Sequence, residues 1–213
     1  MQTRVAAVVV GISFAFAGTA RSGNLTLHPS GFGKKSQAAW KAGEGRPDDC
    51  GTGSFALFFR KDVPTATFAA GVAVVNGIEG TAVSDLTGLS WEHRIDGHCG
   101  AGAPRWNVDV KGASGAAYTL FLGCAAATKT ATSDPNWIED SYAGASIVSV
   151  GGSNAGLSAS QQADAAAGTV TGLSIVFDEG TDAGPGFVFL DNVTVEIAGS
   201  PNVWTASCDN ANK

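Results

Sequence analysis

Leu89-Ser-Trp-Glu-His-Arg-Ile95 decides the fold, because its bulky residues and its small or charged residues alternate from one position to the next. Arg105-Trp-Asn-Val-Asp-Val110 alternates in the same way. A period of two places successive side chains on opposite faces of a β-strand. We therefore expect two strands that each bury one face. Trp91 and Trp106 should lie in the core, with Ile95 and a hydrogen-bonded His93 on the same side as Trp91.

Six further segments have the short apolar runs and turn-residue boundaries that are typical of strands. They are 55–60, 72–75, 117–123, 145–150, 170–178 and 187–197. Eight strands with little helix predict an all-β fold, in which two antiparallel sheets pack as a jelly roll or β-sandwich. One short helix is expected at 159–167, where Ser158 and Gln161 can form a capping box. The segments 22–49 and 128–142 are less regular, so we expect long loops or irregular edges there.

The first twenty residues have the pattern of a secretory signal peptide. Arg4 is their only charge, an apolar run covers 5–18, and the small residues Gly18 and Ala20 follow. This pattern predicts cleavage after Ala20 and a secreted, extracellular protein, with a retained anchor as the alternative. The apolar run is too short to span a bilayer, so no membrane attachment is expected after cleavage. Residues 21–213 should then form a single domain with irregular N- and C-terminal segments.

The charge of the chain narrows the choice of partners. The sequence has 13 Lys and Arg residues against 19 Asp and Glu residues, a net charge of −6. Nucleic-acid binding depends on neutralising phosphates, and this acidic chain has no basic cluster that could do so. We therefore expect no nucleic-acid partner, and we expect a soluble monomer.

Four cysteines follow the predicted signal peptide: Cys50, Cys99, Cys124 and Cys208. In an oxidising compartment an even number predicts two disulfides. A hairpin over 105–123 would bring Cys124 opposite the glycine-rich loop that begins with Cys99, so these two should pair. The other two cysteines then pair by elimination. Metal ligation is the alternative, hinted at by His98 beside Cys99, although no C-x-x-C spacing is present.

The polar neighbours of the two tryptophans are the first candidates for ligand contact. On a rigid sheet they would offer converging donors and acceptors, as a cluster of sugar hydroxyls requires. They are Glu92, Arg94, Arg105, Asn107 and Asp109. The alternative is a solvated sheet face held by salt bridges. An aromatic platform for a sugar ring could come from Trp137 and Tyr142 at the rim, unless these two are anchors buried against the sandwich.

Catalysis has little support in the sequence. The serine-nucleophile elbow G-x-S-x-G, the zinc helix H-E-x-x-H and the phosphate-binding loop are all absent. Glu92 and Asp109 could serve as the acidic pair of a polysaccharide hydrolase or lyase if their strands were neighbours. A structural protein of the cell exterior is a third hypothesis. The sequence favours binding over catalysis.

The acidic turn 178–182 and the later Asp191 have the oxygen-rich character that suits a structural Ca²⁺ ion. The candidate ligands are Asp178, Asp182 and Asp191, and the alternative is a set of solvated carboxylates.

Phe187-Val-Phe-Leu-Asp-Asn-Val-Thr-Val195 resembles the last strand of secreted carbohydrate-binding-module-like jelly rolls, which often close with an apolar residue, Asp, Asp or Asn, and alternating apolar residues. The resemblance implies that Asp191 ligates Ca²⁺ together with an acidic residue of the opening strand. Residues 24–37 contain no Asp or Glu and so depart from that pattern. The leading hypothesis is a secreted binding module for a polysaccharide or another cell-surface ligand.

Overall fold

The computed structural model describes residues 25–47 and 54–205. The predicted signal peptide and the predicted Cys50–Cys208 pair lie outside the described residues. No helix within the described ranges is long and apolar enough to cross a membrane.

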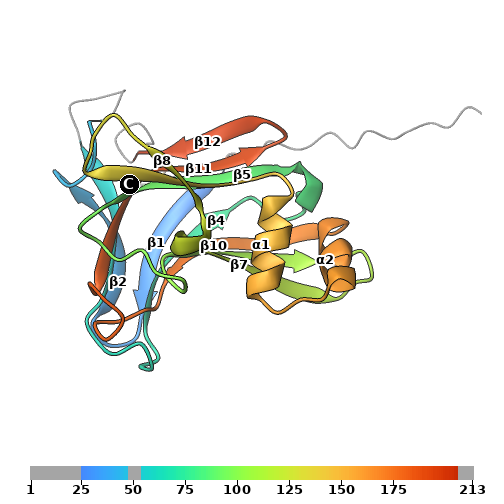
Figure 1. Cartoon of the computed structure of the whole chain (residues 1–213), viewed down its shortest axis with the longest axis horizontal. Helices are drawn as coiled ribbons and strands as arrows, with labels where there is room; N and C mark the ends of the chain where they lie inside the picture. The colour runs from blue at the N-terminus through green and yellow to red at the C-terminus, as the bar shows by residue number, and fades with distance from the viewer. Residues whose placement is uncertain (1–24, 48–53, 206–213) are drawn as a thin grey trace, which may run out of the picture.

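Two antiparallel sheets pack face to face, as the alternation predicts (Figure 1). The smaller sheet has five strands in the order β1 (Thr26–Phe32), β4 (Ala70–Asn76), β10 (Thr169–Phe177), β6 (Arg105–Lys111) and β7 (Ala117–Gly123). The larger sheet has seven, in the order β2 (Ser36–Ala42), β3 (Phe55–Lys61), β11 (Phe187–Ile197), β5 (Leu86–Arg94), β9 (Trp137–Ala143) and β8 (Thr128–Ala131), with β12 (Ser200–Trp204) paired to β11. The predicted all-β sandwich of the jelly-roll type is confirmed.

The core lies between the two sheets and is centred on the two tryptophans. Trp91 of β5 and Trp106 of β6 are 1% and 0% exposed, and their rings stack with 5.2 Å between centroids. They come from opposite sheets, so this contact joins the two layers. Truncating either ring would remove one of the largest buried surfaces of the chain, at a cost of about 3–5 kcal/mol.

The described residues contain two α-helices where the sequence predicts one, and these helices lie at one end of the sandwich (Figure 1). The expected helix is α2 (Ala159–Ala166), and its capping box is formed as predicted. The predicted strand 145–150 is wrong, because this segment begins α1 (Ser146–Asn154). Ile147 and Gly151 are buried four positions apart, which is helical spacing, and the missing side chain of Gly151 lets the helix lie against Leu120 of β7. Two short 3-10 helices, η1 (Val83–Asp85) and η2 (Cys124–Ala126), complete the fold.

The segments predicted as long loops or irregular edges contain four strands, so the prediction of loops is wrong, whereas three of these strands do lie at sheet edges. The two segments form β1 and β2 in one case and β8 and β9 in the other. The edge strands among them are β1, β2 and β8. All four residues of β8 are exposed, so this strand lacks the apolar face that a sequence pattern would reveal. The prediction for Ile95 is also wrong, because β5 ends at Arg94 and the Ile95 side chain is 53% exposed.

Cys99 and Cys124 form a disulfide, the pair that the hairpin argument predicts. Cys99 lies in the loop that follows β5 of the larger sheet, and Cys124 directly follows β7 of the smaller sheet. The bridge therefore ties the two layers together.

Candidate functional site

The structure divides the five polar candidates between the two outer faces of the sandwich. Glu92 and Arg94 lie on β5 of the larger sheet, whereas Arg105, Asn107 and Asp109 lie on β6 of the smaller sheet. The tryptophans of β5 and β6 point towards each other, into the core. The polar side chains that alternate with them along each strand therefore point outwards, on opposite faces of the sandwich. The expectation of one shared face is wrong. Glu92 and Asp109 have the core between them and cannot act as an acidic pair.

On the larger sheet, the two candidates are engaged by the segment that follows β2. The guanidinium of Arg46 donates to both carboxylate oxygens of Glu92 at 2.6 Å, and this hydrogen bond raises the pKa of Arg46. Arg94 donates to Glu44 at 2.7 Å and lies 3.8 Å above the ring of Phe189. Glu92 and Arg94 are therefore both engaged in ion pairs within the chain.

Trp137 and Tyr142 are buried, each 4% exposed, so the interpretation as anchors is the one that their positions support. Trp137 packs in a small apolar cluster with Ala56 and Phe189. Tyr142 points into the main core, and its hydroxyl donates to the carbonyl of Gly123 at 2.5 Å. Burial, followed by the nearby charge of Asp140, raises the pKa of this phenol. Neither ring is exposed enough to stack on a sugar.

The outer face of the smaller sheet is more open. The strand register aligns one row of side chains across all five strands: His28, Val74, Ser174, Asn107 and Phe121. The side chain of Val74 is 38% exposed even though it lies on a central strand. This face therefore presents a mixed polar and apolar surface on paired strands.

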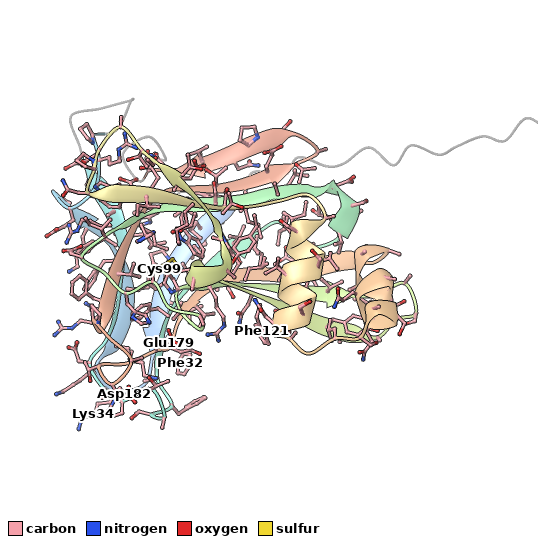
Figure 2. The ribbon with its side chains drawn as sticks, viewed as in Figure 1. Phe32, Lys34, Cys99, Phe121, Glu179 and Asp182 are labelled. Atoms are coloured by element: carbon pink, nitrogen blue, oxygen red, sulfur yellow. A yellow bond between two sulfur atoms is a disulfide. The ribbon has the colours of Figure 1, made fainter. Side chains whose placement is uncertain are left out.

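A hollow of about 420 Å³ lies at one end of this face. It is bordered by two phenylalanines, Phe32 at the end of β1 and Phe68 in the loop before β4. Their rings are 5.0 Å apart, and Phe68 is 88% exposed. Figure 2 shows Phe32 and Phe121 on the same side of the molecule, beneath the smaller sheet. Two exposed aromatic rings thus lie against each other at this border, a feature that the sequence alone did not reveal.

Arg105 organises the polar side of the hollow. Its guanidinium makes a bidentate contact with Asp178 at 2.6 and 2.8 Å, and its Nε donates to Oδ1 of Asn107 at 2.9 Å. The same guanidinium lies 5.6 Å from the ring centre of Phe121. This bond fixes the orientation of the Asn107 amide. Its Nδ2 group donates no hydrogen bond to another of the described residues. We call Phe32, Phe68, Arg105, Asn107, Phe121 and Asp178 together the ligand face.

Asp109 lies on the same face, one row further along β6. Its carboxylate accepts a hydrogen bond from the hydroxyl of Thr119 at 2.6 Å. Asp109 therefore extends the polar part of the surface beyond the ligand face.

The three carboxylates predicted to bind Ca²⁺ have separate partners. Asp178 pairs with Arg105, Asp182 accepts hydrogen bonds from the hydroxyl and backbone amide of Thr65, and Asp191 accepts one from the backbone amide of Arg46. The bonds from Thr65 lower the pKa of Asp182. Within the described ranges these three aspartates do not form a group that could hold a metal ion. The structure does not bring the predicted ligands together.

A buried lysine lies beside the acidic turn, in addition to Arg105. Lys61 is 1% exposed, and its Nζ donates to the backbone carbonyls of Thr65, Thr67 and Asp178 at 2.6–2.9 Å. These bonds connect the end of β3 with the loop that carries Phe68 and with the end of β10. Lys61 therefore holds the border of the hollow in place.

A second polar cluster lies in the interior beside the disulfide. Asp140 of β9 is 1% exposed and accepts hydrogen bonds from the indole of Trp91, from His93 and from the ammonium of Lys129. The prediction that His93 is a hydrogen-bonded core residue is confirmed. Its partner Asp140 was not predicted, because 128–142 was expected to be irregular and an isolated Asp in such a segment gives no signal.

The aromatic residues of the ligand face were not predicted either. Phe121 alternates with Leu120 and Leu122, so its outward position could have been inferred from the period of two. Phe68 stands alone in a loop, and Phe32 ends an edge strand, so neither belongs to a pattern. Their proximity becomes visible only once the end of β1 and the loop before β4 are placed side by side.

No family model matches this chain, and no curated protein matches it. Among solved structures, it is similar to the family 11 carbohydrate-binding module of the cellulosomal cellulase Lic26A-Cel5E of Clostridium thermocellum. The identity is 12% and the TM-score 0.41, and the match covers 86% of this chain and 91% of that one. The assignment of the fold rests on the strand pairing of this chain itself.

Proposed function

We propose that this chain is an exported polysaccharide-binding module that holds its ligand on the ligand face. The observation that carries the proposal is the hollow of about 420 Å³ between the exposed rings of Phe32 and Phe68 and the ordered polar groups of Arg105 and Asn107. Sugar rings present apolar C–H faces and polar hydroxyl edges, so a surface that binds them needs both kinds of group.

The ligand face matches the two sides of a sugar ring. The phenyl rings at its border offer flat apolar surfaces. Asn107 offers an oriented amide, and Asp178 offers a carboxylate whose side chain is 38% exposed. These groups stand on strands or on loops held by Lys61, so little freedom is lost when a ligand binds.

The charge of the face favours a neutral glycan. Arg105 and Asp178 neutralise each other through two hydrogen bonds, and the chain as a whole is acidic. An anionic polysaccharide would be repelled by the net charge, and it would find the guanidinium of Arg105 paired and the ammonium of Lys61 buried against three backbone carbonyls. Affinity should therefore change little with salt concentration.

Screening residues 21–213 against plant, fungal and bacterial glycans tests the proposal. We expect retention by at least one neutral polysaccharide. Phe68→Ala should then weaken binding about tenfold, or ~1.4 kcal/mol, because the most exposed ring of the platform is lost.

Ile95→Ala is the matched control, since it also removes an exposed apolar side chain but lies outside the ligand face. Its affinity should equal that of the unmodified chain. Silence across the whole panel would contradict the proposed function, and equal weakening by both substitutions would contradict the location of the site.

A further inference from the structure

We propose that reduction of the Cys99–Cys124 disulfide converts the buried cluster beside it into a Zn²⁺ site, with His93, Cys99, Cys124 and Asp140 as the ligands. These four residues come from β5, the loop after it, the end of β7 and β9. One ligand atom from each lies within 4.8 Å of all the others. The fold therefore gathers four donors from distant parts of the sequence.

The donor set suits zinc. Two sulfurs, one imidazole nitrogen and one carboxylate oxygen are all ligands that Zn²⁺ accepts, and four of them give the closed tetrahedral site that is typical of structural zinc. His93 and Asp140 are 5% and 1% exposed, so water has little access to complete the coordination. The indole of Trp91 donates to Asp140 at 3.0 Å and would orient the carboxylate from the second coordination shell.

The charges of such a site balance. Two thiolates and one carboxylate carry three negative charges, and Zn²⁺ compensates two of them. The third is compensated by Lys129, whose Nζ contacts Asp140 and lies 3.3 Å from Sγ of Cys99. A buried site with no net charge avoids the desolvation cost of an unpaired ion.

The conversion requires a reductant and exchanges protons for metal. A dithiol attacks the disulfide, most directly at the half-buried Cys99, and its two electrons and two protons yield two thiols while the dithiol closes to a cyclic disulfide. Zn²⁺ then displaces both thiol protons. In the oxidised chain the two sulfurs are bonded to each other, so disulfide and zinc exclude one another. The site would thus hold zinc in the reduced chain and a disulfide in the oxidised one.

Cobalt titration tests the proposal directly. The chain carries Cys50→Ser and Cys208→Ser, so that a thiolate signal can come only from the remaining pair, and it is reduced with a phosphine that is then removed. We expect one Co²⁺ ion per chain, with sulfur-to-cobalt charge-transfer bands and the visible bands of tetrahedral cobalt, all abolished by one equivalent of Zn²⁺. The oxidised chain should show none of these bands.

Substitutions separate the proposed ligands from their neighbours. His93→Gln and Asp140→Asn should each weaken cobalt binding at least ~10-fold. His98→Gln is the matched control, because His98 precedes Cys99 in the sequence but bonds to Glu179 at 2.6 Å instead, and it should leave the affinity unchanged. Binding that is unaffected by His93→Gln and Asp140→Asn would overturn the proposal.

X-ray absorption of the zinc-loaded, reduced chain provides a measurement that does not depend on substitutions. We expect a first coordination shell of two sulfur and two nitrogen or oxygen atoms. Any other shell, or failure of the reduced chain to retain zinc, would overturn the assignment of the site.

Discussion

Arg105 is the residue on which the geometry of the ligand face depends. It holds Asp178 through two parallel hydrogen bonds and Asn107 through a third. A lysine keeps the charge but cannot make the bidentate contact or orient the amide. Arg105→Lys should therefore weaken glycan binding by roughly five- to tenfold, about 1 kcal/mol, with a stability change of similar size. Calorimetric titration measures the first effect and thermal unfolding the second; unchanged affinity would remove Arg105 from the site.

A substitution of Lys61 tests whether its buried hydrogen bonds stabilise the border of the hollow. Its replacement by methionine keeps most of the apolar stem but removes the ammonium group and leaves three backbone carbonyls without their donor. We expect Lys61→Met to lower the free energy of unfolding by about 3 kcal/mol. Lys111→Met is the control, because Lys111 is exposed on β6 and should shift the stability by less than ~0.5 kcal/mol. Denaturant unfolding compares the two, and equal losses would contradict the role of Lys61.

Tyr142 gives the fold a dependence on alkaline pH. Burial raises its pKa in the folded chain above the ordinary value of 10.0, so folding favours the neutral phenol. The stabilisation that this provides is complete below pH 10.0 and is lost as the pH rises through the higher pKa of the folded state. The free energy of unfolding should therefore fall as the pH rises above 10.0, and it should fall less steeply in Tyr142→Phe.

The measurement for Tyr142 is denaturant unfolding at a series of pH values on both sides of 10.0. Tyr118 is the other tyrosine of the chain and provides the comparison. Its partly buried phenol has a pKa raised mainly by its hydrogen bond to Asp164, so Tyr118→Phe should change the slope less. Identical slopes for Tyr142→Phe and the unmodified chain would contradict the account.

At the scale of elements, the sequence predicted the strands with a regular apolar pattern, the edge strand β7 included, and missed β1, β2, β8 and the inner strand β9. β5 and β6 each bury one complete face, which imposes the alternation that identified them. β1, β2 and β8 are edge strands, so each has a strand neighbour on one side only. Their side chains need not alternate, so the pattern disappears although the backbone still pairs.

Helix α1 shows why a short apolar run is ambiguous. Its apolar residues fit a buried strand as well as a helix, and only contact with β7 separates the two. A Cβ atom at Gly151 would lie 2.8 Å from Cβ of Leu120, so a side chain there must push the helix away. Gly151→Val should therefore cost about 1–3 kcal/mol of stability. Ser153→Ala on the exposed side of α1 is the control; thermal unfolding with equal midpoints would contradict this packing.

At the scale of the whole molecule, the sequence gives the composition of each strand but not the sheet to which it belongs. Trp91 and Trp106 were correctly placed in the core, yet the same reasoning combined polar neighbours that lie on opposite outer faces. Only the strand order separates Arg105 and Asn107 from Glu92 and Arg94. It also brings Phe32, Phe68 and Asp178 next to Arg105, from segments far apart in the sequence.

Nuclear magnetic resonance with isotope-labelled protein tests the central claim most directly. A neutral glycan that the chain retains is added stepwise while backbone and side-chain amide signals are followed. The account predicts that the largest shifts fall on the Asn107 side-chain amide, on residues 105–109 and on the backbone of Phe68. The account would be contradicted if the shifts fell on residues 88–94 and 137–141 of the larger sheet while the signals of Asn107, residues 105–109 and Phe68 did not move.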